Sequence, residues 1–331
     1  MSLIITGGCG FIGINFIKKF LNLPTDEDII NIDNLTYSAN LVASEELKKN
    51  KRYVFMKGDI NDQDLISNCL NKYKPRAIIN FAAETHVDRS IDNPHIFIKS
   101  NILGTYNLLE CSRRYLNGKS KDFRFIHVST DEVFGSLELN DKPFHEKSNY
   151  DPSSPYSSSK AASDHLARSW GRTYNLPVIV TNCSNNYGPY QHVEKLIPHM
   201  IFKAMKNLTL PVYGAGQNIR DWLFVEDHCE AIYEILNNGK IHSNYCIGGN
   251  SEVKNIDLVE MICDILDEIR PKKESSYKDL IQFVDDRPGH DLRYAINASK
   301  IRNELKWKPK ENLATGLKKT INWYLKNNYK N

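Results

Sequence analysis

The sequence predicts an α/β protein built on a doubly wound parallel sheet, with a second, smaller mixed α/β domain. Short apolar runs alternate with amphipathic stretches through the first half of the chain, a pattern typical of parallel strands joined by helices. A glycine-rich turn directly follows the first apolar run, as expected of a nucleotide-binding strand–turn–helix unit. After about residue 184 proline and glycine become frequent and the alternation is lost, which indicates a change of architecture.

The elements of the first half follow one another in a regular order. Their connections are expected to be right-handed, because parallel strands are joined that way almost without exception. The predicted strands are 3–6, 28–33, 53–59, 76–83 and 124–130. A sixth strand is expected within 176–189, where it runs into a loop. The predicted helices are 12–22, 62–73, 93–117 and 154–175.

We expect two domains. Residues 1–183 should form the cofactor-binding part, and 184–331 mainly the substrate-binding part. A segment near 221–248 is expected to return to the first sheet, and 255–269 has the apolar spacing of a helix.

Composition limits the classes of function. The 331 residues include 43 Lys and Arg against 40 Asp and Glu, a net charge of only +3, so we expect neither a nucleic-acid nor a membrane partner. The seven cysteines form no CxxC pair and there is no HExxH motif, which favours neither a disulfide framework nor a metal site. No apolar run approaches the roughly 20 residues of a membrane helix. We therefore expect a cytoplasmic protein.

The turn "TGGCGFIG" contains Gly7, Gly10 and Gly13 between a strand and a helix. Glycines at this spacing let the backbone approach a pyrophosphate at the helix N-terminus. Asp33 lies twenty residues beyond Gly13, at the end of the second strand, where an acid binds the ribose hydroxyls and disfavours a 2′-phosphate. The sequence thus predicts NAD rather than NADP. Asp59 either contacts adenine or is a turn residue.

In "SPYSSSKAASDHL", Tyr156 and Lys160 are four residues apart and share one helix face. A nearby ammonium and a positive nicotinamide ring would stabilise the phenolate, which makes Tyr156 a candidate base. The pattern alone also fits a core tyrosine beside a surface lysine.

The segment "STDEVFG" places Asp131 and Glu132 side by side where the 124–130 strand ends. Adjacent carboxylates repel, and burial increases the repulsion. The pair fits an acid and a base with separated pKa values, but it equally fits a solvated turn or the first turn of a helix.

The chain resembles the extended short-chain dehydrogenase/reductase family and, within it, the nucleotide-sugar 4,6-dehydratases. The resemblance covers nearly the whole chain and implies the dinucleotide-binding Rossmann fold with NAD. The stretches that carry it are "TGGCGFIG", "IDNLTYSANL", "FAAETHVDRSI", "HVSTDEVFG", "PYSSSKAASDHL", "NCSNNYGPYQ", "EKLIP", "RDWLFVEDH" and "RPGHDLRY".

The resemblance implies oxidation of the sugar at C4, loss of water across C5 and C6, and hydride return to C6. It assigns Tyr156 as the base at the C4 hydroxyl, Lys160 as the group that tunes it, and Thr130 as the group that orients the hydroxyl. It assigns Glu132 as the base at C5 and Asp131 as the acid at the C6 hydroxyl, an order that the sequence by itself leaves open.

The resemblance also implies two sets of contacts. The expected cofactor contacts are Gly7, Gly10, Phe11, Ile12, Gly13, Asp33, Asn34, Thr36, Asp59, Ile60, Ala82, Ala83, Ser100, Tyr156, Lys160 and Asn186. The expected substrate contacts are Thr85, His86, Thr130, Asn185, Lys195, Leu196, Pro211, Tyr213, Arg220, Asn255, Arg287 and His290. Arg220 and Arg287 can each bind phosphate oxygens bidentately, although a lone arginine usually forms a surface ion pair.

Alternatives stay open at this point. The resemblance favours dTDP-glucose as substrate, with UDP-glucose next, and a 4-epimerase, a uronate decarboxylase or an inactive NAD-binding regulator less so. Phe134 stands where the pattern usually has tyrosine, and "YSAN" and "ETH" replace "YAGN" and "ESH"; the lost hydroxyl concerns substrate preference rather than reaction type. The resemblance further implies a homodimer built from the helices around 93–117 and 154–175.

Overall fold

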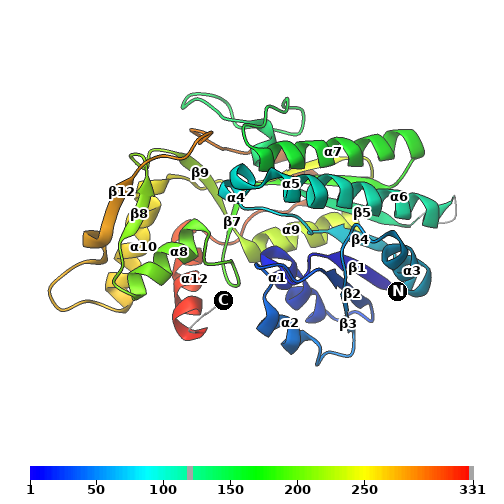
Figure 1. Ribbon diagram of the computed structural model, residues 1–331, viewed down its shortest axis with the longest axis horizontal. Coiled ribbons are helices and arrows are strands. Elements are labelled where there is room, and N and C mark those ends of the chain that lie inside the picture. Colours follow the sequence, from blue (N-terminus) through cyan, green and yellow to red (C-terminus); the bar gives the residue numbers. More distant parts are fainter. Residues whose placement is uncertain (118–121, 328–331) are drawn as a thin grey trace.

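A seven-stranded parallel sheet forms the larger part of the protein (Figure 1). The computed structural model describes residues 1–117 and 122–327. The strand order is β10-β6-β5-β4-β1-β2-β3, and every neighbouring pair is parallel. The strands are β1 (Ser2–Thr6), β2 (Asp28–Asp33), β3 (Tyr53–Lys57), β4 (Ala77–Asn80), β5 (Arg124–Thr130), β6 (Val178–Cys183) and β10 (Asn244–Ile247).

Helices cover both faces of this sheet, which explains why β1, β4 and β6 are buried at every position. One face packs against α1 (Phe11–Leu21), α2 (Leu41–Leu47), α9 (Val225–Asn238) and α11 (Ser299–Leu305). The other face packs against α3 (Gln63–Tyr73), α6 (Thr105–Leu116) and α7 (Pro155–Tyr174). Shorter elements lie between them: α4 (Val87–Asp92), α5 (Pro94–Phe97), the π-helix η1 (Ile98–Gly104) and the 3₁₀-helix η2 (Asp131–Phe134).

Helix α7 is fixed at both ends by its sequence. Ser154 and Ser157 form a reciprocal capping box, and Pro155 occupies the first turn. At the other end Asn175 adopts the left-handed conformation that commonly ends a helix. These signals place Tyr156 and Lys160 in the first two turns, next to the end of β5.

A second group of elements packs around its own apolar core (Figure 1, left). A three-stranded sheet has the order β11-β9-β7, and β12 pairs with β8 in parallel. The strands are β7 (Asn185–Tyr187), β8 (Leu210–Tyr213), β9 (Ile219–Phe224), β11 (Glu252–Lys254) and β12 (Ile281–Val284). The helices are α8 (Leu196–Met205), α10 (Asn255–Ile269), α12 (Leu313–Asn327) and the 3₁₀-helix η3 (Tyr277–Leu280).

The predicted α/β class with a doubly wound parallel sheet is confirmed, while several element boundaries differ. The strands predicted at 53–59 and 76–83 end at Lys57 and Asn80, and 93–117 is divided into α5, η1 and α6. Within 221–248, β10 joins the main sheet and α9 packs on it, whereas residues 221–224 lie in β9 of the smaller sheet. The domain boundary itself stays a prediction. In the described part of the chain, no helix is both long enough and apolar enough to cross a bilayer.

Candidate active site

Three cavities follow the carboxyl edge of the main sheet and the adjoining face of the smaller one. Their volumes are about 250, 220 and 530 Å³. The first lies over the ends of β1, β2 and β4, the second over the ends of β5 and β6, and the third among α8, β8 and β9. In open parallel sheets this edge is where ligands bind.

The glycine turn after β1 fits a phosphate-bearing cofactor. Gly7 has φ +69°, and a Cβ there would lie 2.6 Å from the Ala82 backbone. A Cβ on Gly13 would lie 2.5 Å from the Gly7 carbonyl oxygen. Gly10 is the N-cap of α1, so the first amides of that helix face the cavity edge as an anion site. The turn therefore has the close backbone packing that a dinucleotide pyrophosphate requires.

Asp33 ends β2 with its carboxylate fixed beside this turn. One carboxylate oxygen accepts from the Cys9 amide and the other from the Leu35 amide, each at 2.8 Å. Burial raises the pKa of Asp33, and these two hydrogen bonds act against that rise. Asn34 donates to Asp59 at 3.3 Å across the same cavity. This end is suited to the hydroxyls of a ribose.

The structure brings all the predicted cofactor residues to the first two cavities. Those that line the first cavity are Gly7, Gly10, Asp33, Asn34, Thr36, Asp59, Ile60, Ala82, Ala83 and Ser100. Those that line the second include Gly7, Gly10, Phe11, Ile12, Gly13, Ala83, Tyr156, Lys160 and Asn186.

The five predicted catalytic residues, Thr130, Asp131, Glu132, Tyr156 and Lys160, all line the second cavity. Thr130 ends β5 and caps η2, where its hydroxyl oxygen accepts from the Glu132 amide at 3.2 Å. The same hydroxyl donates to Asp131 Oδ1 at 3.3 Å. The two acids therefore form the first turn of a short helix, but Asp131 is only 1% exposed, which excludes a solvated turn.

Asp131 and Glu132 have different electrostatic surroundings although they are adjacent. Burial raises the pKa of Asp131 well above its ordinary value, and the charges of Glu132 and Asp221 raise it further. Burial also raises the pKa of Glu132, but the positive charges of Lys195, Arg220 and Arg287 oppose the rise. Asp131 Oδ2 is buried and has no hydrogen-bond partner among the described residues. This arrangement favours a protonated Asp131 beside an ionised Glu132.

Tyr156 and Lys160 project from α7 toward the end of β5. Burial and the charges of Glu132 and Cys183 raise the pKa of Tyr156, against a hydrogen bond with Thr130 that lowers it. The Lys160 ammonium donates to the Val128 carbonyl at 2.8 Å. A base role for the phenol therefore requires positive charge next to it.

The third cavity contains cations and unpartnered polar atoms. Arg220 is only 5% exposed, and its guanidinium donates to the Ile219, Leu292 and Asp291 carbonyls, so the surface ion pair considered for it is wrong. Arg287 Nη1, Asn185 Oδ1 and Asn255 Oδ1 are buried without a partner among the described residues. Such orphaned groups indicate a site for a polar ligand.

Eleven of the twelve predicted substrate residues line the second or third cavity. They are Thr85, Thr130, Asn185, Lys195, Leu196, Pro211, Tyr213, Arg220, Asn255, Arg287 and His290. His86 lines none of the three cavities; it caps α4 and lies 3.8 Å from Glu194.

Phe134 points away from the chemistry. Its ring is 2% exposed, stacks on Phe144 with centroids 5.2 Å apart, and meets Tyr150 edge-on at 5.1 Å. It lines none of the three cavities. The missing hydroxyl is therefore a feature of the core behind η2 rather than of the ligand site.

Sequence reasoning missed two acidic residues, Glu194 and Asp221, in or beside the site. Glu194 lies among Tyr37, His192 and Arg89 at the mouth of the second cavity, with Arg89 3.1 Å away. Asp221 approaches Asp131 closely enough to raise its pKa. Both residues lie in motifs that carry the family resemblance. The sequence does not indicate, however, where the side chain of a single acidic residue points.

The comparisons with known proteins agree with this geometry. Residues 4–320 match the model of the GDP-mannose 4,6 dehydratase family. A dTDP-glucose 4,6-dehydratase of Haemophilus influenzae is 52% identical over 99% of this chain and 98% of its own length. The crystal structure of a Bacillus anthracis dTDP-glucose 4,6-dehydratase in complex with NAD has a TM-score of 0.88 at 44% identity, covering 99% of this chain and 97% of that one. That of a Streptomyces venezuelae dTDP-glucose 4,6-dehydratase with NAD and TYD bound has a TM-score of 0.90 at 40% identity, covering 99% and 98%.

Proposed function

The chain belongs to the GDP-mannose 4,6 dehydratase family, and on that premise we propose that it is an NAD-dependent dTDP-glucose 4,6-dehydratase. It converts dTDP-glucose into dTDP-4-keto-6-deoxyglucose by C4 oxidation, loss of water across C5 and C6, and hydride return to C6. The observation that carries this proposal is the adjacent pair of a buried Asp131 and a half-buried Glu132 in the same cavity as Tyr156 and Lys160. A 4-epimerase needs only chemistry of the Tyr156 type, whereas a dehydratase also needs an acid and a base for elimination.

The cofactor residues fit NAD. The glycine turn leaves no room for a Cβ at Gly7 or Gly13, and Asp33 is held where an acid receives ribose hydroxyls. When bound, NAD would supply reversible hydride acceptance and a positive charge. Lys160, one helical turn beyond Tyr156, adds its own positive charge, so the Tyr156 phenolate is stabilised and accepts the C4 hydroxyl proton.

Elimination is assigned to the two carboxyl groups. Once C4 is a ketone, the C5 proton is acidic, and the ionised Glu132 takes it. Lys195, Arg220 and Arg287 support this assignment because their charges favour the ionised form of Glu132. Asp131, whose pKa is raised well above its ordinary value, retains a proton that it donates to the departing C6 hydroxyl. The environment thus supports this order of the two roles, which the sequence by itself leaves open.

The nucleotide diphosphate is assigned to the third cavity. Arg220 and Arg287 line it together with His290, and guanidinium groups bind phosphate oxygens bidentately. Asn185 lines both the second and the third cavity, which supports one elongated substrate reaching from the diphosphate site to Tyr156. On this proposal the main sheet holds the cofactor, and residues 184–331 hold most of the nucleotide.

The test uses purified protein with dTDP-glucose and UDP-glucose in separate reactions and no added cofactor. A 4-keto-6-deoxy product from dTDP-glucose, at a rate well above that from UDP-glucose, is expected. A 4-epimer as product, or no turnover of dTDP-glucose, contradicts the proposal.

A homodimer and a cytoplasmic location belong to the same proposal. Ile98, Leu103, Tyr106 and Tyr174 are each 43–51% exposed on η1, α6 and α7, an apolar set that supports pairing of two copies through these helices. All seven cysteines are free and buried, as in proteins of a reducing compartment.

A further inference from the structure

Asp164 is a buried carboxylate that lies next to the catalytic residues but outside all three cavities. It sits on α7, is 0% exposed, and follows Lys160 by four residues. A buried charge requires partners, because removing it from water is costly.

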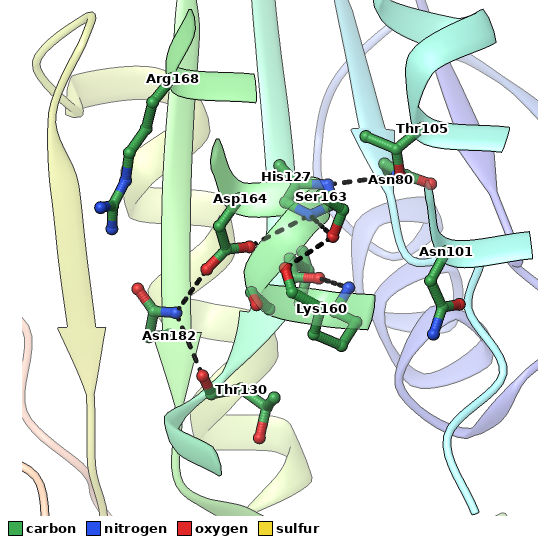
Figure 2. Close-up of polar contacts among 12 residues, drawn as sticks. Asn80, Asn101, Thr105, His127, Thr130, Lys160, Ser163, Asp164, Arg168 and Asn182 are labelled. Carbon is green, nitrogen blue, oxygen red and sulfur yellow. Dashed lines mark hydrogen bonds and ion pairs between the residues drawn. The ribbon is translucent and has the colours of Figure 1, made fainter. Parts of the chain in front are cut away.

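Groups from the loop before α7, from β6 and from β5 hold this carboxylate, and Figure 2 shows the contacts from the two strands. Oδ2 accepts from the Tyr150 hydroxyl at 2.7 Å and from Asn182 Nδ2 on β6 at 3.0 Å. Oδ1 lies 3.3 Å from His127 Nε2 on β5. Asn182 Nδ2 also donates to the Thr130 carbonyl at 3.1 Å. Asp164 therefore connects the Tyr156–Lys160 helix to the strand that ends in Thr130.

His127 is neutral in this network. The Ser163 hydroxyl donates to the Lys160 carbonyl at 2.8 Å, so it accepts the hydrogen of His127 Nε2 at 3.1 Å. Asn80 Oδ1 accepts from Thr6 at 2.6 Å, which directs the Asn80 amide nitrogen to His127 Nδ1 at 3.2 Å. One ring nitrogen donates and the other accepts, as in a neutral imidazole. Burial also lowers the pKa of His127.

Because His127 carries no charge, the positive charge opposite Asp164 comes from Lys160 and Arg168. Arg168 reaches the network through the Tyr150 hydroxyl, to which it donates at 2.5 Å. Lys160 is 3% exposed and lies on the same helix face as Asp164. Burial lowers the pKa of Lys160, and the charge of Asp164 is the largest influence that raises it. Burial acts to raise the pKa of Asp164, but its contacts with His127 and the Lys160 charge outweigh that effect, so it stays below the ordinary value.

We propose that Asp164 is a positioning residue for the reaction: the network centred on it fixes α7 against β5 and provides the buried counter-charge that keeps Lys160 an ammonium. Without it, Lys160 would be a buried cation whose one hydrogen-bond partner among the described residues is the Val128 carbonyl. The other ionisable groups that face this pair are His127 on β5, Cys183 on β6, Tyr150 in the loop before α7, and Tyr156 and Arg168 on α7. None of these supplies a negative charge at neutral pH in the protein alone, since burial raises the pKa of Cys183, Tyr150 and Tyr156.

The first test measures Lys160 directly and needs no substrate. Protein labelled with ¹³C at the lysine methylene next to the ammonium is titrated by NMR, and the Lys160 signal is assigned by its loss in Lys160→Met. Asp164→Asn, which removes the charge but little volume, is expected to lower the pH at which Lys160 loses its proton by about one unit or more. Asp227→Asn is the matched control, because Asp227 is 3% exposed and accepts from the Glu311 amide, away from α7; it should leave the Lys160 titration unchanged.

The second test rests on the proposed function and follows turnover of dTDP-glucose against pH. The alkaline limb of the pH–rate profile should report the loss of the Lys160 proton. In Asp164→Asn this limb should move to lower pH, in parallel with the NMR titration. Equal Lys160 titrations in the wild type and Asp164→Asn, or an equal shift in Asp227→Asn, overturn the inference. If Asp164→Asn does not fold, Asp164→Ser provides the same loss of charge in a smaller side chain. A wild-type Lys160 that is already neutral at about pH 7 overturns the inference without any variant. Failure of the proposed substrate leaves the NMR result standing, so the two failures are distinguishable.

Discussion

Glu132 is the residue on which the elimination step depends most. It is half-buried and faces Lys195, Arg220 and Arg287. Glu132→Gln keeps the shape but removes the base, so we expect C4 oxidation to continue while elimination slows by about 10²–10⁴-fold. Stopped-flow absorbance should show reduced cofactor persisting on the enzyme. Wild-type product yield from Glu132→Gln would refute the assigned base.

Asp131 gives a prediction about stability and pH. The folded-state pKa of Asp131 is raised above its unfolded-state value. The protonated carboxyl therefore contributes to the free energy of unfolding at acid pH, and this contribution is lost as pH rises from the unfolded-state pKa through the folded-state pKa. Asp131→Asn removes a buried group that must ionise. The variant should match the wild type below about pH 4 and become increasingly more stable than it as pH rises beyond the unfolded-state pKa. Urea unfolding across this range checks the trend; an equal or lower stability of Asp131→Asn at neutral pH would contradict it.

At the scale of residues, local sequence supplied candidates for the site, and the resemblance supplied their roles. Motif residues such as Tyr156 and Asp131 lie near the ends of strands or at the start of a helix, where local patterns are informative. The order proposed for the acid and the base could not be derived from the local sequence, because the support for it comes from Arg220 and Asp221 on β9. The neutral state of His127 was equally inaccessible, since it follows from contacts with β4 and α7.

At the scale of elements, the glycine turn between β1 and α1 makes a specific prediction. Gly7→Ala places a methyl group 2.6 Å from the Ala82 backbone at φ +69°, a conformation that costs about 1–3 kcal/mol for a residue with a Cβ. We expect lower thermal stability and little NAD retained through purification.

Gly10→Ala is the control in the same turn. Its φ is −74°, and its Cβ would lie 3.2 Å from the Gly7 carbonyl, so it should lose less stability and less cofactor than Gly7→Ala. Equal losses in the two variants would show that the geometry at Gly7 is not what holds the cofactor.

Element boundaries were less predictable where tertiary contacts override local pattern. The periodicity of 93–117 indicates one helix, yet residues 98–104 are π-helical. There Asn101 pairs with the Glu84 backbone through both its amide nitrogen and its carbonyl oxygen, at 3.0 and 2.9 Å. That pairing joins segments 17 residues apart, so no local periodicity could reveal it.

At the scale of the whole molecule, the exposed apolar side chains of η1, α6 and α7 predict self-association. Leu103→Glu places a charge in the middle of that surface, and light scattering should report a shift from dimer to monomer. Leu139→Glu is the matched control, because Leu139 is 60% exposed on a loop outside these helices, and it should leave the mass unchanged. A wild-type monomer, or a dimer undisturbed by Leu103→Glu, would contradict the proposed interface.

Six strands of the main sheet could be predicted because they are apolar runs that alternate with helical patterns along the chain, whereas β10 was expected only within the broader segment near 221–248. The smaller part could not, because β7, β9 and β11 are short, come from distant segments and pair in an order that the sequence does not state. The third cavity lies in this smaller part, among α8, β8 and β9, which is why most of its residues came from resemblance rather than from pattern.

The most direct test of the central claim follows one hydrogen through the reaction. The protein is given dTDP-glucose carrying deuterium at C4, without added cofactor, and the product is analysed by NMR and mass spectrometry. The proposed function predicts a 4-keto-6-deoxy product with that deuterium on C6 and no net reduced cofactor, because the hydride removed by oxidation is returned within the same turnover. A product whose C6 lacks the deuterium, or a 4-epimer that retains its C6 hydroxyl, would contradict it.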